Sequence, residues 1–305
     1  MVIAGVLFFI TIIVGPIVLG LIGWFKTRSS PDHGLTEDNE TSLPSAMPRV
    51  VNAVVLYVLA FNLIFFVQEL FLVLPKVAIG GMRPTLFHNN QTVGIEHPAL
   101  GLTEGGGAVA IFIVGLIFVV VFMKLRTSTS VFKWFALWIA YHGLVQSIHQ
   151  VTLGVIDPGL DFGEAMTYLN IGEPLGIILS IISNIALVAV GLLITRPLLE
   201  MAPSTMLIAS PGRRTKFILQ VGMLITLLGA ILIIPFRIPP LELATGPFII
   251  AFFAMPWALA NAWRVTDVQA IGNAANERIS WVAIVLTVIL LAVFQLVLAP
   301  GIRFY

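Results

Sequence analysis

Two histidines, His142 and His149, lie seven residues apart in the apolar segment WIAYHGLVQSIHQ, residues 138–150. Residues spaced by three or four positions share one face of an α-helix, so both histidines and Gln146 form a polar stripe if this segment is helical. Neutral imidazole is a common metal ligand, and its unperturbed pKa of about 6.5 also suits proton transfer. Because the two histidines would be separated by about 10.5 Å along the helix axis, they cannot bind one ion together. The stripe predicts separate metal or haem sites completed by other helices, a proton path, or a structural seam between helices.

A second apolar segment carries Asn62 and Glu69 with the same spacing of seven residues. In the predicted topology both segments run in the same direction, so Asn62 matches His142 in depth and Glu69 matches His149. An ionisable residue near the centre of a bilayer costs about 2.5–3.5 kcal/mol, and it therefore needs a partner inside the bundle. We expect the two helices to pack along this polar seam. Glu69, His142 and His149 are the candidates for catalytic residues and for metal ligands.

The candidates for a binding site are amide and charged residues in or near the same segments. They are Asn62, Gln68, Gln146, Asp157, Asp161 and Arg237. Arg237 lies between prolines in the segment IIPFRIPP. We expect it to neutralise Glu69 or an acid of the turn 157–164, or to bind an anionic substrate or lipid head group.

The remaining ionisable residues near this end are interpreted as surface groups. Asp157, Asp161 and Glu164 lie within eight residues but lack the 12-residue spacing of an EF-hand calcium loop, which favours a solvated acidic turn. His88 and His97 lie in a polar connection, where exposure of an imidazole is not costly. Both are expected on surface turns.

The elements that position these residues are predicted to be transmembrane helices. Of the 305 residues, 58% are hydrophobic and 10% are charged, and the mean hydropathy of +1.03 excludes a water-soluble globular domain. Stretches of about 20 apolar residues follow one another, and each is long enough to cross a hydrocarbon core of roughly 30 Å. We predict an all-α polytopic membrane bundle of about eight transmembrane helices, forming a single domain over residues 1–305. The predicted spans are about 2–25, 51–75, 107–124, 132–154, 174–195, 217–236, 246–263 and 279–299.

The distribution of Lys and Arg predicts the orientation of the bundle. Twelve of the sixteen basic residues fall on one side of the predicted spans. The other four are Lys76, Arg83, Arg237 and Arg303. Because cytoplasmic loops retain positive charge, both termini are predicted to be extracytoplasmic, together with the end that carries Glu69 and His149.

Two prolines are expected to shape the helices. Pro75 is expected to end the second span, because proline lacks the N–H that continues a helix. Pro256 is expected to kink the seventh span and to free a backbone carbonyl. The chain contains no cysteine, which excludes disulfides, thiolate metal ligands and iron–sulfur clusters.

Three classes of function are compatible with this pattern. A membrane-embedded enzyme, or a subunit that binds a cofactor or metal, would use an extracytoplasmic-facing polar site between the second, fourth and sixth spans. A proton- or ion-coupled transporter would also need polar residues leading inward, and beyond Asn184 and Gln220 these are few. A structural accessory subunit of a membrane complex would need the seam only for packing. The one-sided polarity favours the first class.

The expected partners follow from composition alone. The lipid bilayer is the predicted surrounding, other membrane subunits are compatible partners, and no nucleic-acid partner is expected. The sequence names no cofactor, substrate or reaction.

Overall fold

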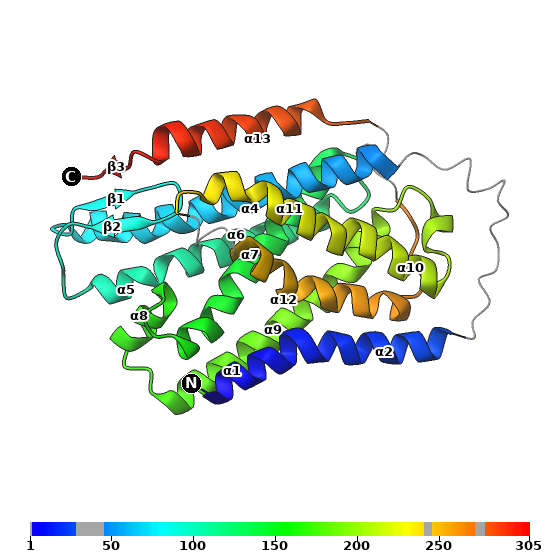
Figure 1. Cartoon of the computed structure of the whole chain (residues 1–305), viewed down its shortest axis with the longest axis horizontal. Coiled ribbons are helices and arrows are strands. Elements are labelled where there is room, and N and C mark those ends of the chain that lie inside the picture. Colours follow the sequence, from blue (N-terminus) through cyan, green and yellow to red (C-terminus); the bar gives the residue numbers. More distant parts are fainter. Residues whose placement is uncertain (1, 29–45, 241–245, 272–277) are drawn as a thin grey trace.

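Long apolar runs form the main helices of this protein, as a computed structural model of the chain shows (Figure 1). The structure describes residues 2–28, 46–240, 246–271 and 278–305. Within these ranges, seven helices are long and apolar enough to cross a membrane. This finding confirms the predicted all-α, multi-pass membrane fold.

Several of the seven spans are made of more than one helical element. The first, Val2–Thr27, comprises α1 (Val2–Phe9), a π-helical turn (Ile10–Val14) and α2 (Gly15–Thr27); the second lies in α4 (Ala46–Ile79); the third comprises α5 (Leu100–Glu104) and α6 (Gly106–Lys124). The others are α9 (Glu173–Glu200); α10 (Pro211–Ile218) with a π-helical turn (Leu219–Met223) and α11 (Leu224–Arg237); α12 (Gly246–Asn261) with a 3₁₀ turn (Ala262–Arg264); and α13 (Trp281–Val293) with a π-helical turn (Phe294–Leu298).

The fourth predicted span is the helix α7, Val131–Ile156, which is not among the seven apolar helices. Its histidines and glutamines lower its hydropathy. α7 packs against α4, α6 and α9, and most of its side chains are buried. Since α7 faces other helices rather than lipid, it can carry polar residues that a lipid-exposed helix could not.

Glycine allows α6 and α7 to approach closely. A Cβ atom added to Gly143 of α7 would lie 2.6 Å from the Cα atom of Gly115 in α6. Small residues at helix contacts bring backbones together in membrane bundles, where van der Waals packing drives association. This contact sets how α7 is rotated against its neighbour.

α4 continues beyond Pro75 to Ile79, so the prediction that Pro75 ends this helix is wrong. Pro75 cannot donate a hydrogen bond to the carbonyl oxygen of Phe71, one turn earlier. α6 covers this point of α4, since a Cβ atom on Gly106 would lie 2.5 Å from that oxygen. Close packing by a neighbouring helix therefore accompanies the continuation past the proline.

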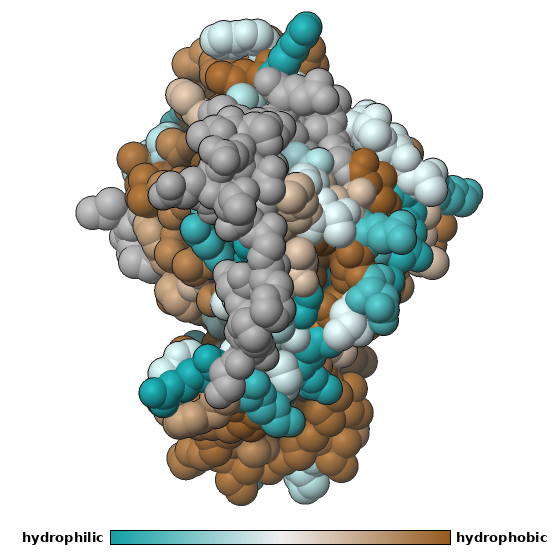
Figure 2. Space-filling view, turned by 90° about the vertical axis from the view of Figure 1, so that its right-hand side faces the viewer, coloured by the Kyte–Doolittle hydropathy of each residue, from teal (hydrophilic) through white to brown (hydrophobic). Residues whose placement is uncertain are grey.

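One end of the bundle carries the short helix α8 (Asp161–Tyr168) and the strands β1 (Pro84–Leu86), β2 (Gln91–Val93) and β3 (Ile302–Arg303). The antiparallel strands have the order β2-β1-β3, so the last residues of the chain pair with the 84–93 hairpin. We call this the hairpin end. The start of α1 and the C-terminus both lie toward it, whereas α2 ends and α4 begins at the opposite end (Figure 1). Hydrophilic residues gather on the face of that opposite end, with apolar surface beside them (Figure 2).

Candidate functional site

Segments of α4, α7, α8, α11 and α12 enclose a cavity of about 220 Å³ toward the hairpin end. Its polar lining residues are Gln68, Gln146, His149, Gln150, Asp161 and Arg237. Phe61 and Phe65 of α4 and Ile250 of α12 contribute apolar surface. The structure thus brings together five of the predicted site residues, and it adds Gln150 to them.

Arg237, the last residue of α11, presents a guanidinium group to this cavity. Its Cζ atom lies 3.8 Å from the centre of the Phe65 ring. Within the described ranges, its Nε and Nη1 atoms are buried without a hydrogen-bond partner. Glu69 acts electrostatically on Arg237 without forming an ion pair with it in the described part of the chain. Arg237 therefore has N–H groups left to bind an acceptor.

The segment around Arg237 is held by side chains from two other elements. Asn89, in the turn between β1 and β2, donates a hydrogen bond of 2.9 Å from Nδ2 to the carbonyl oxygen of Arg237, and a second to that of Pro239. Gln295 donates from Nε2 to the carbonyl oxygens of Pro235, at 2.6 Å, and Ile238, at 3.0 Å. These bonds fix the position of the backbone that carries the guanidinium.

Three glutamine side chains line the seam between α4 and α7. Gln150 Nε2 donates to Gln68 Oε1 at 3.1 Å and to the carbonyl oxygen of Gln146 at 2.7 Å. The side chain of Gln146 is buried, and its Nε2 has no partner among the described residues. The two helices therefore pack together as predicted, but the hydrogen bond between them joins Gln68 and Gln150 rather than the expected pairs. Gln150 was missed, although its spacing of four from Gln146 places it on the same helix face.

His149 lines the cavity but does not contact Glu69 in the way we expected. Its Nδ1 atom lies 2.6 Å from the carbonyl oxygen of Val145, one turn earlier, and its ring centre lies 4.8 Å from that of Phe253 in α12. A carbonyl oxygen can only accept a hydrogen bond, so Nδ1 carries the proton. In neutral His149, Nε2 is then the acceptor nitrogen.

His142 and Asn62 lie deeper in the bundle than the cavity. Asn62 Nδ2 donates to the carbonyl oxygen of Val58 in its own helix at 2.8 Å. The ring of His142 contacts the rings of Tyr57 and Phe61, with centres 4.3 and 5.2 Å away. Although the backbone of Tyr57 lies near this ring, neither ring nitrogen completes a hydrogen bond with a described residue. The expected contact between Asn62 and His142 is therefore not formed.

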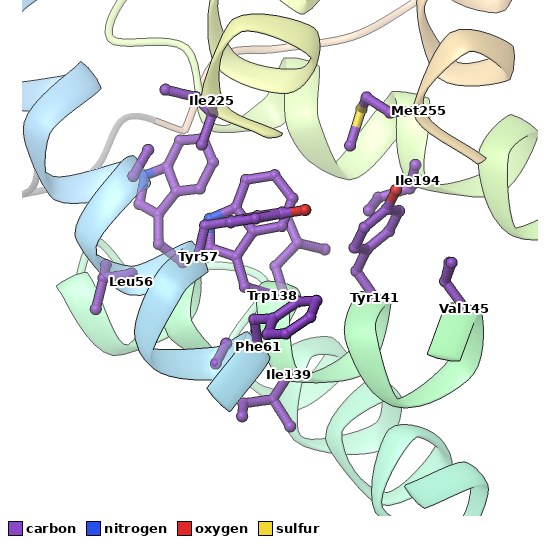
Figure 3. Packing of buried hydrophobic residues seen from close by; sticks show 14 of the residues in the cluster. Leu56, Tyr57, Phe61, Trp138, Ile139, Tyr141, Val145, Ile194, Ile225 and Met255 are labelled. Atoms are coloured by element: carbon purple, nitrogen blue, oxygen red, sulfur yellow. The ribbon is translucent and has the colours of Figure 1, made fainter. Parts of the chain in front are cut away.

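The surroundings of His142 are a layer of aromatic side chains from α4 and α7. Figure 3 shows Tyr57, Phe61 and Trp138 gathered between these helices, with Tyr141 directed toward Met255. The rings of Tyr57 and Trp138 meet edge to face, with centres 5.1 Å apart, and all four aromatic side chains are buried. Aromatic rings thus surround this histidine, and the hydroxyl groups of Tyr57 and Tyr141, like both His142 ring nitrogens, are buried without a hydrogen-bond partner among the described residues.

The acidic turn divides into one residue at the cavity and two at the surface. Asp161, at the start of α8, lines the cavity, and burial raises its pKa from 3.8 to about 6, with a further rise from the nearby charge of Glu104. Asp157 is exposed, and its Oδ1 accepts a hydrogen bond of 3.0 Å from the backbone N–H of Gly159. Glu164 is also exposed. The solvated-turn interpretation holds for Asp157 and Glu164, but not for Asp161.

A buried ion pair lies beside this site. Lys76 Nζ and Glu104 Oε1 are 2.8 Å apart, and the side chains of these residues are 0% and 7% exposed. Gln91 of β2 donates from Nε2 to Glu104 Oε2 at 3.2 Å. Lys76 and Glu104 both act electrostatically on Glu69, which is itself buried. This pair was not predicted, although Lys76 lies seven residues after Glu69 on the same helix face.

His88 is buried, so its assignment to a surface turn is wrong. It lies in the β1–β2 turn, close to the backbone of Ile238 and Pro239, and burial lowers its pKa. The turn is packed against the 237–240 segment, which sequence spacing does not indicate. His97 is partly exposed, and its Nδ1 accepts a hydrogen bond of 3.1 Å from the backbone N–H of Ala99.

Metal binding by Glu69, His142 or His149 gains no support from the geometry. In the described part of the chain, no group of three His, Cys, Asp or Glu residues lies close enough together to hold a metal ion. His142 is enclosed by aromatic rings, and His149 faces Phe253 and the glutamines. The cavity is built from hydrogen-bonding groups of α4, α7, α8 and α11.

The fold and the cavity define a multi-pass helical membrane protein with a small polar site toward one end of its bundle. Comparison with protein-family models, with curated proteins and with solved structures gave no match.

Proposed function

We propose that this protein binds a small anionic or carbonyl-rich molecule in the 220 Å³ cavity, at the extracytoplasmic side of the membrane, as a membrane-embedded enzyme or ligand-binding subunit. The observation that carries the proposal is a set of unused donors. Arg237 Nε and Nη1 and Gln146 Nε2 are buried without partners among the described residues, and both side chains line the same cavity. Buried donors without partners carry a desolvation penalty, which an acceptor-rich ligand removes.

The size of the cavity limits the ligand. Pockets for drug-sized molecules measure roughly 300–1,000 Å³, so a cavity of 220 Å³ suits a smaller molecule. Phe61, Phe65 and Ile250 would contact its apolar part, and Arg237 with Gln146 would bind its carboxylate or carbonyl oxygens. A small organic acid has both parts.

Two further groups of the cavity support proton transfer to or from such a ligand. His149 Nε2 is an acceptor because Nδ1 donates to Val145. Asp161 has a pKa of about 6, so it holds or releases a proton near neutral pH. A base and an acid that line one cavity form the arrangement that general acid–base catalysis requires.

A transporter is the weaker proposal. Passage through the membrane needs polar groups that continue from the cavity to the opposite end. Below the cavity, the rings of Tyr57, Phe61 and Tyr141 pack against His142, and the polar atoms of the two tyrosine side chains and of the imidazole form no hydrogen bond with a described residue. This aromatic layer favours a site that opens to one side only.

The sidedness of the site rests on charge. Most Lys and Arg residues of the sequence fall at the end opposite to the hairpin, and such residues are retained on the cytoplasmic side. The cysteine-free chain allows a direct test with single cysteines at two exposed positions, Asn90→Cys in the hairpin and Thr129→Cys before α7. In intact cells, a membrane-impermeant maleimide should label the first and not the second. The reverse labelling would refute the proposed orientation.

Ligand binding is tested with small probes on the purified full-length protein in detergent. Acetate, benzoate and inorganic phosphate are titrated while the thermal unfolding midpoint is measured. The midpoint should rise with at least one probe, and Arg237→Gln should abolish the rise. Arg303→Gln, which removes an exposed arginine at the same end, should leave it unchanged. The proposal would be contradicted if the probes raised the midpoints of the wild type and of Arg237→Gln equally. It would also be contradicted if no probe at millimolar concentrations raised the midpoint of the wild type.

A further inference from the structure

A second, larger cavity of about 520 Å³ lies between α6, α7 and α9. Its walls are mainly apolar and include Leu137 and Leu144 of α7 and Val190 of α9. Met123 and Leu193, which also line it, are 67% and 73% exposed, so this groove is bordered by freely accessible apolar side chains. In a membrane-spanning bundle, such side chains face the lipid.

One end of the groove carries charge that its walls lack. Arg126 Nη2 lies 2.6 Å from Glu200 Oε1, and Arg196 Nε lies 3.2 Å from the same oxygen. The two arginine side chains are 55% and 49% exposed, whereas that of Glu200 is 6% exposed. Two guanidinium groups thus share one carboxylate, which leaves a net positive charge at the accessible mouth of the groove.

The buried side chain of Lys133 adds a third positive charge beside the two arginines. Lys133 Nζ donates to the carbonyl oxygen of Arg126 at 2.5 Å, and the lysine side chain is fully buried. Arg196 makes one further contact, from Nη2 to the carbonyl oxygen of Asp267 at 3.1 Å. The Glu200 carboxylate therefore interacts with two exposed guanidinium groups and, electrostatically, with the buried ammonium group of Lys133. A site with this excess of positive charge favours an anion.

The length of the groove matches one leaflet of a bilayer. It extends along α9 from Val190 to Glu200, a separation of ten residue steps in one helix. At 1.5 Å per residue this is about 15 Å, which is half of a hydrocarbon core of roughly 30 Å. The charged mouth then lies at the membrane surface and the apolar walls lie at the depth of acyl chains.

We propose that this groove binds an anionic phospholipid, with one acyl chain between α6, α7 and α9 and the phosphate on Arg126 and Arg196. The Nε and Nη2 atoms of both arginines already donate to Glu200 or to the carbonyl oxygen of Asp267, so their Nη1 groups, which make no hydrogen bond with a described residue, remain to donate to the phosphate. The basic end is the predicted cytoplasmic side, where anionic lipids attract positive residues. This site does not depend on the function proposed for the polar cavity.

Lipid retention and thermal unfolding test the proposal on the full-length protein in nanodiscs of phosphatidylcholine, with or without phosphatidylglycerol. The wild type should retain phosphatidylglycerol through detergent purification and unfold at a higher temperature when it is present. The double variant Arg126→Gln/Arg196→Gln should retain about tenfold less phosphatidylglycerol per protein. Its midpoint should no longer depend on that lipid.

Two control variants separate the specific site from other effects. Lys124→Gln/Lys216→Gln removes the same charge from exposed residues that do not line the groove, and it should keep the lipid response. The arginine variant leaves the buried carboxylate of Glu200 without its partners, which could unfold the protein. The triple variant Arg126→Gln/Arg196→Gln/Glu200→Gln removes that unpaired charge, and its lipid retention is compared with that of the wild type. The proposal would be overturned if the wild type retained phosphatidylcholine and phosphatidylglycerol equally. It would also be overturned if the Lys124→Gln/Lys216→Gln variant lost as much phosphatidylglycerol as the arginine variant, or if inorganic phosphate alone raised the midpoint as much as the lipid does.

Discussion

The guanidinium carbon of Arg237 lies 3.8 Å from the centre of the Phe65 ring, at the wall of the polar cavity. A cation within about 6 Å of an aromatic centre is attracted to the ring face. This contact stabilises the positive charge without using the N–H groups that point outward from the guanidinium. Glu69 adds electrostatic stabilisation and still leaves those groups without a hydrogen bond in the described part of the chain.

The Phe65 contact should be measurable as an energy of coupling. In a double-mutant cycle of Phe65→Leu and Arg237→Gln, we expect a coupling of about 0.5–2 kcal/mol, because a desolvated cation–π contact has that strength. The free energy of unfolding in mixed micelles is the measurement. Phe71→Leu serves as the control, since Phe71 lies on the same helix and is 42% exposed. If both phenylalanine substitutions gave the same coupling with Arg237→Gln, the contact would contribute nothing specific.

The residues of the cavity could be predicted from sequence because helix periodicity and chain direction determine face and depth. Gln146 and His149 were placed on one stripe of the fourth span toward one end of the bundle, and both line the cavity. On the second span, Gln68 lines it, whereas Glu69, the residue expected on the facing stripe, is not among the lining residues. Pro-flanked Arg237 was recognised as an isolated basic residue in a connection of that end. These inferences need only the 3.6-residue repeat and the direction of the spans.

The partners of these residues could not be predicted, because they depend on how each helix is rotated against its neighbours. The contact of Gly143 with Gly115 sets the rotation of α7 against α6, and no spacing in the sequence indicates that these two glycines meet. With this rotation, His142 meets Tyr57 rather than Asn62. The buried positions of His88 and Lys76 likewise depend on tertiary packing at the hairpin end.

The hydrogen bond between Gln68 and Gln150 gives a second prediction. A double-mutant cycle of Gln68→Ala and Gln150→Ala should show a coupling of about 0.6 kcal/mol, the average for polar contacts between membrane helices. The matched cycle of Glu69→Gln and His149→Ala should show no coupling, because neither side chain hydrogen-bonds to the other. Unfolding in mixed micelles again provides the free energies. Coupling in the second cycle but not in the first would mean that the seam pairs differently.

The ion pair of Lys76 and Glu104 gives a third prediction. Lys76→Met should destabilise the fold by about 3–5 kcal/mol, because it leaves the buried carboxylate of Glu104 without its partner. Lys76→Met combined with Glu104→Gln should recover most of that loss, since no buried charge then remains unpaired. The free energy of unfolding measures both effects. A double variant as unstable as Lys76→Met alone would show that lost packing, rather than the unpaired charge, causes the defect.

Asp161 gives a prediction about pH. Its pKa is raised to about 6 by burial and by the charge of Glu104, while Lys76 opposes that rise and Glu164 adds to it. The folded protein therefore holds more protons than the unfolded chain between about pH 4 and 6, so this residue makes the fold less stable as pH rises through that window. An anionic ligand in the cavity should likewise bind better below pH 6, where Asp161 is neutral.

Calorimetric titration with benzoate between pH 5 and 7 tests this dependence, because a carboxylate probe stays ionised above about pH 5. If bound benzoate raises the pKa of Asp161 by one, the affinity at pH 7 is about fivefold lower than at pH 5. Asp161→Asn should bind benzoate with nearly constant affinity over the same range. Glu164→Gln, in the same helix but outside the cavity, should retain the wild-type dependence. An unchanged profile in Asp161→Asn would contradict the assignment of the titration to Asp161.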